Sequence, residues 1–112
     1  MHYFYPSEGN FWPVADDIFN VAGVDGWMET DRSAGMDLRL LRQRYPAVTF
    51  QGNIRSQVLH RGAADDVCRE VLGCVEVAHE LGGVIVGASN LIMPGTPPKN
   101  IFAMLRTIEE NR

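Results

Sequence analysis

The sequence predicts an α/β fold in which four short strands alternate with four helices and form one parallel sheet. Two observations support this: β-rich runs separate amphipathic helical stretches, and short connections join each strand to the next helix. The chain has 112 residues, enough for a single core. We therefore expect one domain over residues 1–112, with the carboxyl ends of all strands at the same edge of the sheet.

The strands are expected at four runs rich in aromatic and β-branched residues. Each run is four to six residues long and is bounded by glycine, proline or polar residues. The four runs are residues 2–5, 24–29, 48–51 and 83–87.

The first two helices are recognised by their apolar spacing and their boundaries. The first begins near Asn10, tolerates Pro13 in its opening turn, and presents one apolar face: Val14, Ile18, Val21 and Ala22. The second is expected from Ser33, a suitable N-cap, through Leu40 to Tyr45, where Pro46 ends it.

The last two helices carry the strongest signals. The third opens at Asp65 and Asp66 and stops at residues 82–83, and its apolar face consists of Val67, Val71, Cys74, Val75 and Ala78. The fourth starts at Thr96, an N-cap followed by two prolines. Its expected buried stripe is Ile101, Met104, Leu105 and Ile108.

Composition excludes several classes of function. The net charge is −4 and the arginines are scattered, so neither nucleic acid nor an anionic membrane is an expected partner. The apolar runs are too short to cross a membrane and the first residues do not resemble a signal peptide, so we expect a cytoplasmic protein. Cys68 and Cys74 are six residues apart and the three histidines are dispersed, so we expect buried thiols and no metal site.

Polar, glycine-containing segments follow the expected strands at residues 7–10, 29–35, 52–55 and 89–96. Ligands of barrels and open α/β sheets bind at the strand ends where such segments lie. The same glycines and asparagines are also ordinary turn residues. Both interpretations remain open at this point.

Several segments in a fixed order resemble the uroporphyrinogen decarboxylase superfamily, which includes methyltransferases that act on corrinoid-bound or thiol methyl groups. The main ones are residues 33–38 (SAGMDL), 52–54 (GNI) and 94–101 (PGTPPKNI), supported by residues 8–10 (EGN) and 62–67 (GAADDV). Members of this superfamily are (βα)8 barrels. The resemblance therefore implies four βα units that form half of a TIM-type barrel, corresponding to the C-terminal half of the family.

The chain departs from both branches of this superfamily at positions that carry chemistry. The methyltransferase branch holds zinc with a His-x-Cys and a later Cys, where this chain has Pro6, Glu8 and Asn90. The decarboxylase branch has a His at the position of Asn90 and an Asp at the position of Arg55. We therefore expect no zinc, no cofactor, and no porphyrinogen decarboxylation by this chain alone.

Seven polar residues remain as candidates at the strand ends. Glu8 and Asp31 are the candidate acid or base, and the proposed ligand-binding residues are Tyr5, Arg32, Asn53, Arg55 and Asn90. Arg55 is the expected anchor, since a guanidinium holds a carboxylate or phosphate through two hydrogen bonds. The alternative is a surface arginine paired with Asp31 or Glu29.

A four-stranded parallel sheet leaves two strand edges and one face uncovered, so we expect a homodimer that closes two half-barrels into an eight-stranded barrel. The open face is expected to be largely apolar. Two functions follow: a half-barrel protein that retains a site for a small anionic metabolite without catalysis, or an active decarboxylase- or methyltransferase-like enzyme. The enzyme would act as a dimer or with a separately encoded N-terminal half.

Overall fold

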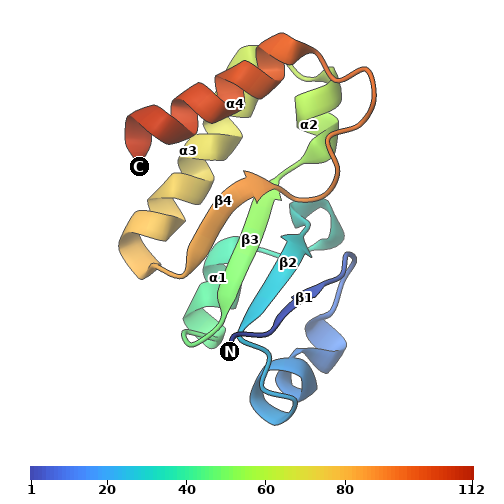
Figure 1. Ribbon diagram of the computed structural model, residues 1–112, viewed down its shortest axis with the longest axis vertical. Helices are drawn as coiled ribbons and strands as arrows, with labels where there is room; N and C mark the ends of the chain where they lie inside the picture. Colours follow the sequence, from blue (N-terminus) through green and yellow to red (C-terminus); the bar gives the residue numbers. More distant parts are fainter.

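The computed structural model describes all 112 residues and contains one parallel sheet with the strand order β1-β2-β3-β4 (Figure 1). All four expected strands are confirmed. Their bounds are Phe4–Pro6 (β1), Gly26–Thr30 (β2), Thr49–Ile54 (β3) and Val84–Ala88 (β4). Each strand ends later than expected, and β3 continues to Ile54, so Gly52 and Asn53 belong to the strand and not to the following loop.

Four α-helices and three short helical turns connect the strands. The α-helices are Leu38–Arg44 (α1), Ser56–Arg61 (α2), Ala64–Leu81 (α3) and Pro98–Asn111 (α4). The turns are the 3-10 helix Trp12–Val14 (η1), the π-helix Asp17–Val21 (η2) and the 3-10 helix Arg32–Ala34 (η3). No helix is both long and apolar enough to cross a membrane.

The helices pack against one face of the sheet, where the core lies. Phe50 and Ile54 are fully buried there, and Val84 and Val86 pack against the same core. Ile85 lies between these two valines in β4 and points to the other face, because side chains alternate along a strand. Its side chain is 48% exposed. No helix covers that second face, which is the arrangement of half a TIM barrel.

Aromatic rings fill the core beneath β2 and β3. The Phe11 and Phe19 rings lie 4.5 Å and 5.7 Å from the Trp27 ring, and Phe19 also contacts Tyr45 and Phe50 at 4.8 Å and 5.4 Å. Such offset and edge-to-face contacts bury large areas and favour fixed ring orientations. This cluster joins the first connection of the chain to α1 and β3.

The first helix differs from the sequence-based expectation. Residues 10–22 form η1 and η2 and do not make one regular α-helix, and Val14 and Val21 are exposed. The buried residues are Phe11, Ala15 and Phe19, which recur every fourth residue. The two rings offer more apolar area than the valines, so the segment turns its aromatic face to the core.

The second helix starts later than expected, and its N-cap was assigned wrongly. Ser33 lies inside η3, whose N-cap Asp31 accepts a hydrogen bond from the Ser33 amide at 2.8 Å. Gly35 then adopts a left-handed conformation (φ +86°), and Asp37 caps α1 by accepting from the Leu40 amide at 2.9 Å. A left-handed glycine, followed two residues later by an aspartate cap, therefore sets the start of α1.

The later helices differ from the expectations in smaller ways. The short helix α2 was not foreseen, and Thr96 does not cap α4 but lies one residue before its N-cap Pro97, with its hydroxyl 3.2 Å from His60 Nδ1. Leu105, placed on the buried stripe of the fourth helix, is 53% exposed. Of the two thiols, Cys74 is buried and Cys68 is half-buried.

Arg42 is a buried charge that holds two loops together. Its side chain is 6% exposed and donates to the carbonyl oxygens of five residues: Tyr45, Pro46, Val48, Leu81 and Gly82. Burial lowers the pKa of this guanidinium from its ordinary value. Arg42 thereby links the turn before β3 to the end of α3, at the edge of the sheet opposite the candidate site.

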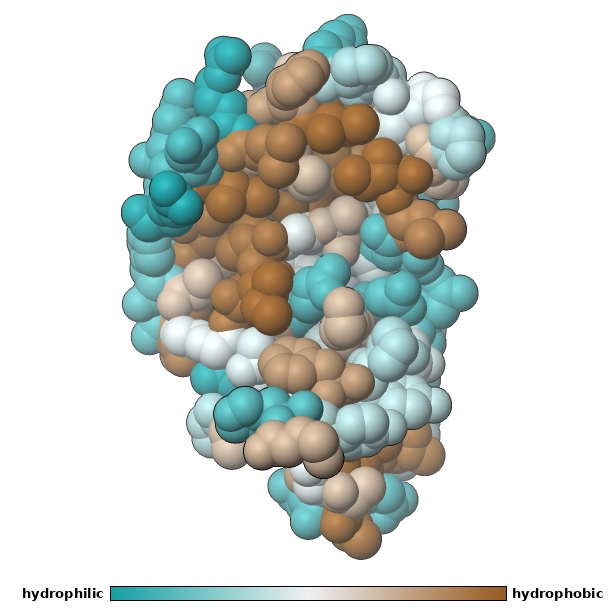
Figure 2. Space-filling model, in the orientation of Figure 1, coloured by the Kyte–Doolittle hydropathy of each residue, from teal (hydrophilic) through white to brown (hydrophobic).

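The open face of the sheet is less apolar than expected. Residues that alternate with the core-facing positions lie there, and they include Met28, Thr49, Gln51 and Ile85. In Figure 2 the apolar surface is concentrated around β4 and α4, and the rest of this side of the molecule is mixed. The exposed apolar residues of that region are Ile85, Leu91, Ile92, Phe102 and Leu105. We call this set the β4–α4 patch.

Candidate functional site

Polar residues from three successive strand ends line one cavity of about 270 Å³. Asp31 follows β2, Arg55 follows β3, and Asn90 follows β4. The remaining lining residues come from the same loops and from α2: Ser33, Ser56, Gln57, Ser89, Leu91 and Met93. The parallel sheet brings these residues together because all four strands end at the same edge.

An irregularity in β2 sets the direction of the first loop. The register between β2 and β3 shifts between Trp27 and Thr30, and Glu29 adopts a left-handed φ of +65°, which is uncommon for a residue with a side chain. Thr30 then turns inward, is fully buried, and donates to the Gln51 carbonyl oxygen at 2.6 Å. Asp31 consequently leaves the strand at the rim of the cavity.

Close packing between β2 and β3 requires a glycine at position 52. Gly52 has a φ of +139°, and a Cβ atom there would collide with the Thr30 hydroxyl and lie 2.8 Å from the Thr30 carbonyl oxygen. Only glycine combines this conformation with this approach. Gly52 thus places Arg55, three residues later, beside the loop that carries Asp31.

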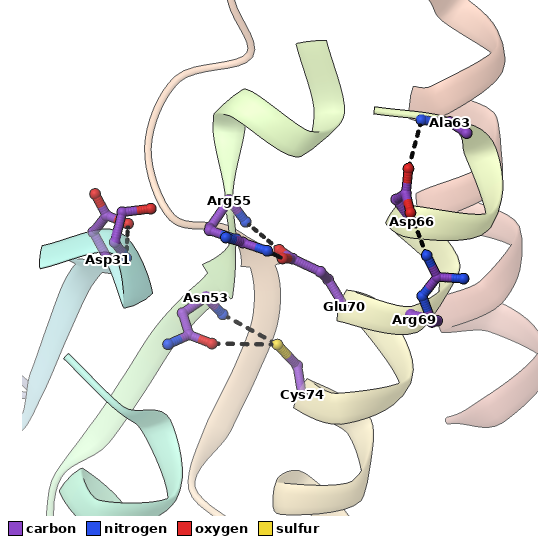
Figure 3. A network of polar contacts seen from close by, with 9 residues as sticks. Asp31, Asn53, Arg55, Ala63, Asp66, Arg69, Glu70 and Cys74 are labelled. Carbon is purple, nitrogen blue, oxygen red and sulfur yellow. Dashed lines mark hydrogen bonds and ion pairs between the residues drawn. The ribbon is translucent and has the colours of Figure 1, made fainter. Parts of the chain in front are cut away.

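Arg55 is paired with Glu70 of α3, and not with Asp31 or Glu29, the partners that the alternative interpretation named. The Arg55 amide donates to Glu70 at 2.8 Å and its Nε donates at 2.5 Å, and a second guanidinium nitrogen also contacts the carboxylate. Figure 3 shows the two side chains pointing toward each other. The Glu70 hydrogen bond raises the pKa of Arg55 above its ordinary value, and Asp31 adds a smaller effect.

The loop after β1 contacts the lining residue Asn90 through Glu8, which does not itself line this cavity. The Asn90 side-chain amide donates to the Glu8 carboxylate, although 82 residues separate them in the sequence. Asn90 also accepts from the Leu91 amide at 2.6 Å, which fixes its orientation. The two sequence-predicted residues at opposite ends of the sheet therefore lie in contact.

Asn53 lies outside this cavity. Its side chain is 1% exposed, donates to the Met36 carbonyl oxygen at 2.9 Å, and lies 3.6 Å from the Cys74 sulfur (Figure 3). Its backbone amide contacts the same sulfur at 3.3 Å. Burial raises the pKa of the Cys74 thiol above its ordinary value. Asn53 therefore joins β3 to α1 and α3 beneath the site.

Tyr5 and Arg32 also lie outside the cavity of Asp31, Arg55 and Asn90. The Tyr5 ring packs 5.1 Å from the Trp27 ring and lines, with Glu8, a separate apolar cavity beside β1. Arg32 lines two other surface cavities, one shared with Arg55 and one beside α1 and α3. Of the seven residues selected from the sequence, four form one connected group: Glu8, Asp31, Arg55 and Asn90.

Glu70 is the residue that sequence reasoning missed, and a signal for it exists. Glu70 falls between Val67, Val71 and Cys74 on the apolar stripe of α3, and its side chain is only 8% exposed. A buried carboxylate needs a positive or hydrogen-bonding partner. A lone acid in such a stripe therefore predicts an ion pair. Ser56 was missed as well, and its buried hydroxyl oxygen has no hydrogen-bond partner.

The residues at the positions of the zinc ligands do not fit that metal. Glu8 and Asn90 meet, so the loops that carry these positions do converge, but they offer one carboxylate and one amide. Pro6 supplies no side-chain donor. Catalytic zinc prefers imidazole and thiolate ligands. No group of three or more His, Cys, Asp and Glu side chains is arranged to hold a metal ion.

Comparison with known proteins agrees with the sequence resemblance. The family model of uroporphyrinogen decarboxylase (URO-D) matches residues 7–111, which include β2, β3, β4 and the loops that follow all four strands. No curated protein sequence matches the chain.

Proposed function

The chain belongs to the uroporphyrinogen decarboxylase family, and from this premise we propose that it is a homodimeric half-barrel that binds a small anionic molecule and does not catalyse decarboxylation. In this proposal residues 1–112 are one domain, equivalent to the last four units of the family barrel. The single observation that carries the proposal is the cavity where Asp31, Arg55 and Asn90 converge from three strand ends.

The uncovered edges of the sheet support a second copy as the partner. β1 and β4 each have one paired neighbour only, so each leaves a row of backbone groups without a strand partner. If β1 of each copy lies beside β4 of the other copy, all eight strands stay parallel and the sheet closes into a barrel. A closed barrel has no edges, and a two-fold axis repeats the same contact.

The side chains at the two ends of the sheet are complementary. The β4–α4 patch presents Phe102 and Leu105, which are 65% and 53% exposed. At the other end, a cavity of about 510 Å³ lies between β1 and the η1–η2 segment, and eight of its eleven lining residues are hydrophobic, including Tyr5 and Val14. Since neighbouring helices of a barrel pack against each other, α4 of one copy would lie against this apolar cavity of its partner.

The free energy available from this contact is sufficient. Burying roughly 600 Å² of apolar surface at about 25 cal/mol per Å² gives on the order of 15 kcal/mol as an upper value. Association costs roughly 4–15 kcal/mol in lost freedom, so even a partly polar interface can be stable. The polar residues of the open face, such as Gln51, reduce the gain, so a stable dimer requires an association cost in the lower part of this range.

An anion is the ligand class that the cavity favours. Arg55 is held by Glu70 through its amide and Nε, while its side chain stays 42% exposed and available at the cavity wall. Asn90 and the three serines that line the cavity add neutral hydrogen-bonding groups. A guanidinium that is already oriented binds a carboxylate or phosphate at little entropic cost.

The acid and base candidates support binding more than catalysis. Asp31 accepts from the Ser33 amide and so caps η3, and Glu8 accepts from Asn90. A general acid or base must exchange a proton with the substrate within hydrogen-bond reach, and both carboxylates already hold donors of the chain. The substitutions at the family positions now occupied by Arg55 and Asn90 agree with a binding role.

Calorimetric titration with small carboxylates and phosphate tests the proposed cavity. Asn90→Asp adds a negative charge beside Glu8 and should weaken anion binding about tenfold or more through repulsion. The matched control is Asn111→Asp, which makes the same change in the last turn of α4, away from the cavity. Equal affinities in both variants and the wild type would refute this site.

A further inference from the structure

A second cavity, of about 540 Å³, lies beside Arg55 on the side of α2 and α3. Four arginines line it: Arg32 from η3, Arg55 from the end of β3, Arg61 from the end of α2, and Arg69 from α3. It shares Arg55 and Gln57 with the cavity of Asp31 and Asn90, so the two spaces are neighbours. We call this second space the arginine cavity.

The charge of the arginine cavity opposes that of the whole chain. The protein has a net charge of −4, yet four of its ten basic residues line this one space. The acidic lining residues are Asp66 and Glu70, so two positive charges remain in excess. A concave surface with one sign of charge attracts counter-ions more strongly than a flat one.

The two carboxylates are each engaged by one arginine. Glu70 holds Arg55, and Asp66 holds Arg69 one turn earlier in α3 while also accepting from the Ala63 amide at 2.9 Å (Figure 3). The ion pairs of the chain include neither Arg32 nor Arg61. Arg32 and Arg61 thus line the cavity without an ion-pair partner, beside two arginines that are held by carboxylates.

We propose that the arginine cavity binds the phosphate group of a phosphomonoester. Such a group carries about −1.5 to −2 charges at pH 7 and three acceptor oxygens, which matches the two excess positive charges and the several N–H donors. Arginine forks bind phosphate oxygens in pairs. The inference rests on the proposed function in one respect: the rest of the ligand extends past Arg55 into the cavity of Asp31 and Asn90.

Titration calorimetry on the 112-residue chain, with inorganic phosphate and with glycerol phosphate, tests this assignment. Arg61→Gln and Arg32→Gln should each weaken binding of both ligands about tenfold or more. The matched control is Arg106→Gln, an exposed arginine of α4 outside the cavity, which should change the affinity by less than about twofold. Raising the salt concentration should weaken binding in the wild type more than in Arg61→Gln.

The outcomes separate this inference from the proposed function. Loss of phosphate binding in Arg61→Gln but not in Asn90→Asp supports the arginine cavity. Loss in Asn90→Asp with full binding in Arg61→Gln and Arg32→Gln would overturn it and leave the first site standing. Succinate binding as tightly as glycerol phosphate would overturn the assignment to phosphate. No heat of binding for phosphate at millimolar concentration would overturn the site itself.

Discussion

β3 and α3 bury most of their large apolar side chains, and three carboxylates of α3 are paired within the chain, whereas β1, η2, β4 and α4 leave several apolar side chains exposed. In the middle, Phe50 and Val71 are completely buried and Glu70 has its partner Arg55. At the ends, Val21 is 80% exposed and Phe102 is 65% exposed. The middle is therefore complete as a single chain, and the ends have the composition of an interface that a second copy would cover.

The largest expected effect is in the middle of the sheet. Phe50→Ala removes a ring with no solvent exposure that contacts Phe19, and it should lower the free energy of unfolding by about 3–5 kcal/mol. Urea unfolding at fixed protein concentration measures this, since the stability of a dimer depends on concentration. A loss below about 1 kcal/mol would contradict the description of β3 as the centre of the core.

The next effect concerns the buried charge of α3. Glu70→Ala leaves Arg55 without its anchor and should lower the free energy of unfolding by about 1–3 kcal/mol. Glu76→Ala is the control, because it removes an exposed carboxylate from the same helix and should cost less than about 0.5 kcal/mol. Equal losses in urea unfolding would show that the Arg55–Glu70 pair adds nothing specific.

This pair also changes how Arg55 can be tested. Arg55→Ala would leave the Glu70 carboxylate, 8% exposed, without its cation, so the variant should lose stability as well as ligand. Loss of binding in that variant would not separate the two roles. Asn90→Asp is the better test of the cavity because Asn90 is half-buried and its only charged partner is Glu8, an exposed carboxylate, so that no buried charge loses its partner.

The smallest expected effect on stability lies near the N-terminus, where Asp16 links the residues just before η2 to α1. The Tyr45 hydroxyl donates to Asp16 at 2.6 Å and Arg44 donates at 2.9 Å, and these bonds lower the pKa of Asp16 below its ordinary 3.8. A carboxylate whose pKa is lowered by folding stabilises the fold at pH values above its pKa in the unfolded chain. This stabilisation is lost as the pH falls through its pKa in the folded chain.

Asp16→Asn should therefore have a lower melting temperature than the wild type above about pH 5, and the difference should shrink as the pH falls below the ordinary aspartate pKa. Asp17→Asn removes an adjacent exposed carboxylate that makes no side-chain hydrogen bond, and it should show no such pH dependence. Thermal melts of the three proteins across this range check the prediction. A difference that persists unchanged at low pH would show that the Asp16 contacts do not depend on its charge.

The sequence was sufficient for the alternation of elements and for α3 and α4, because apolar periodicity and prolines mark them directly. It failed for residues 10–22, since both Val14 and Phe11 begin plausible apolar faces and only the position of Trp27 decides between them. The strand ends were also missed. Polar residues such as Asn53 complete β3 through contacts with Met36 and Cys74, which are distant in the sequence.

The two buried charged residues, Arg42 and Glu70, could have been predicted from the sequence. Arg42 lies with Leu38, Leu41 and Tyr45 on the apolar stripe of α1, and Glu70 occupies the same kind of position in α3. A charge in such a stripe indicates a buried partner. The stripe does not identify that partner, because Arg42 binds backbone carbonyls and Glu70 binds a side chain, and both choices depend on the packing of other elements.

Sedimentation equilibrium at micromolar concentration tests most directly the central claim that a second copy completes the ends of this half-barrel. The wild type should have twice the 12.5 kDa mass of one chain. Leu105→Glu, in the β4–α4 patch, should dissociate or unfold it, while Leu72→Glu, at a similarly exposed leucine of α3, should remain dimeric. A well-folded wild-type monomer, or a dimer that both variants retain, would contradict the account.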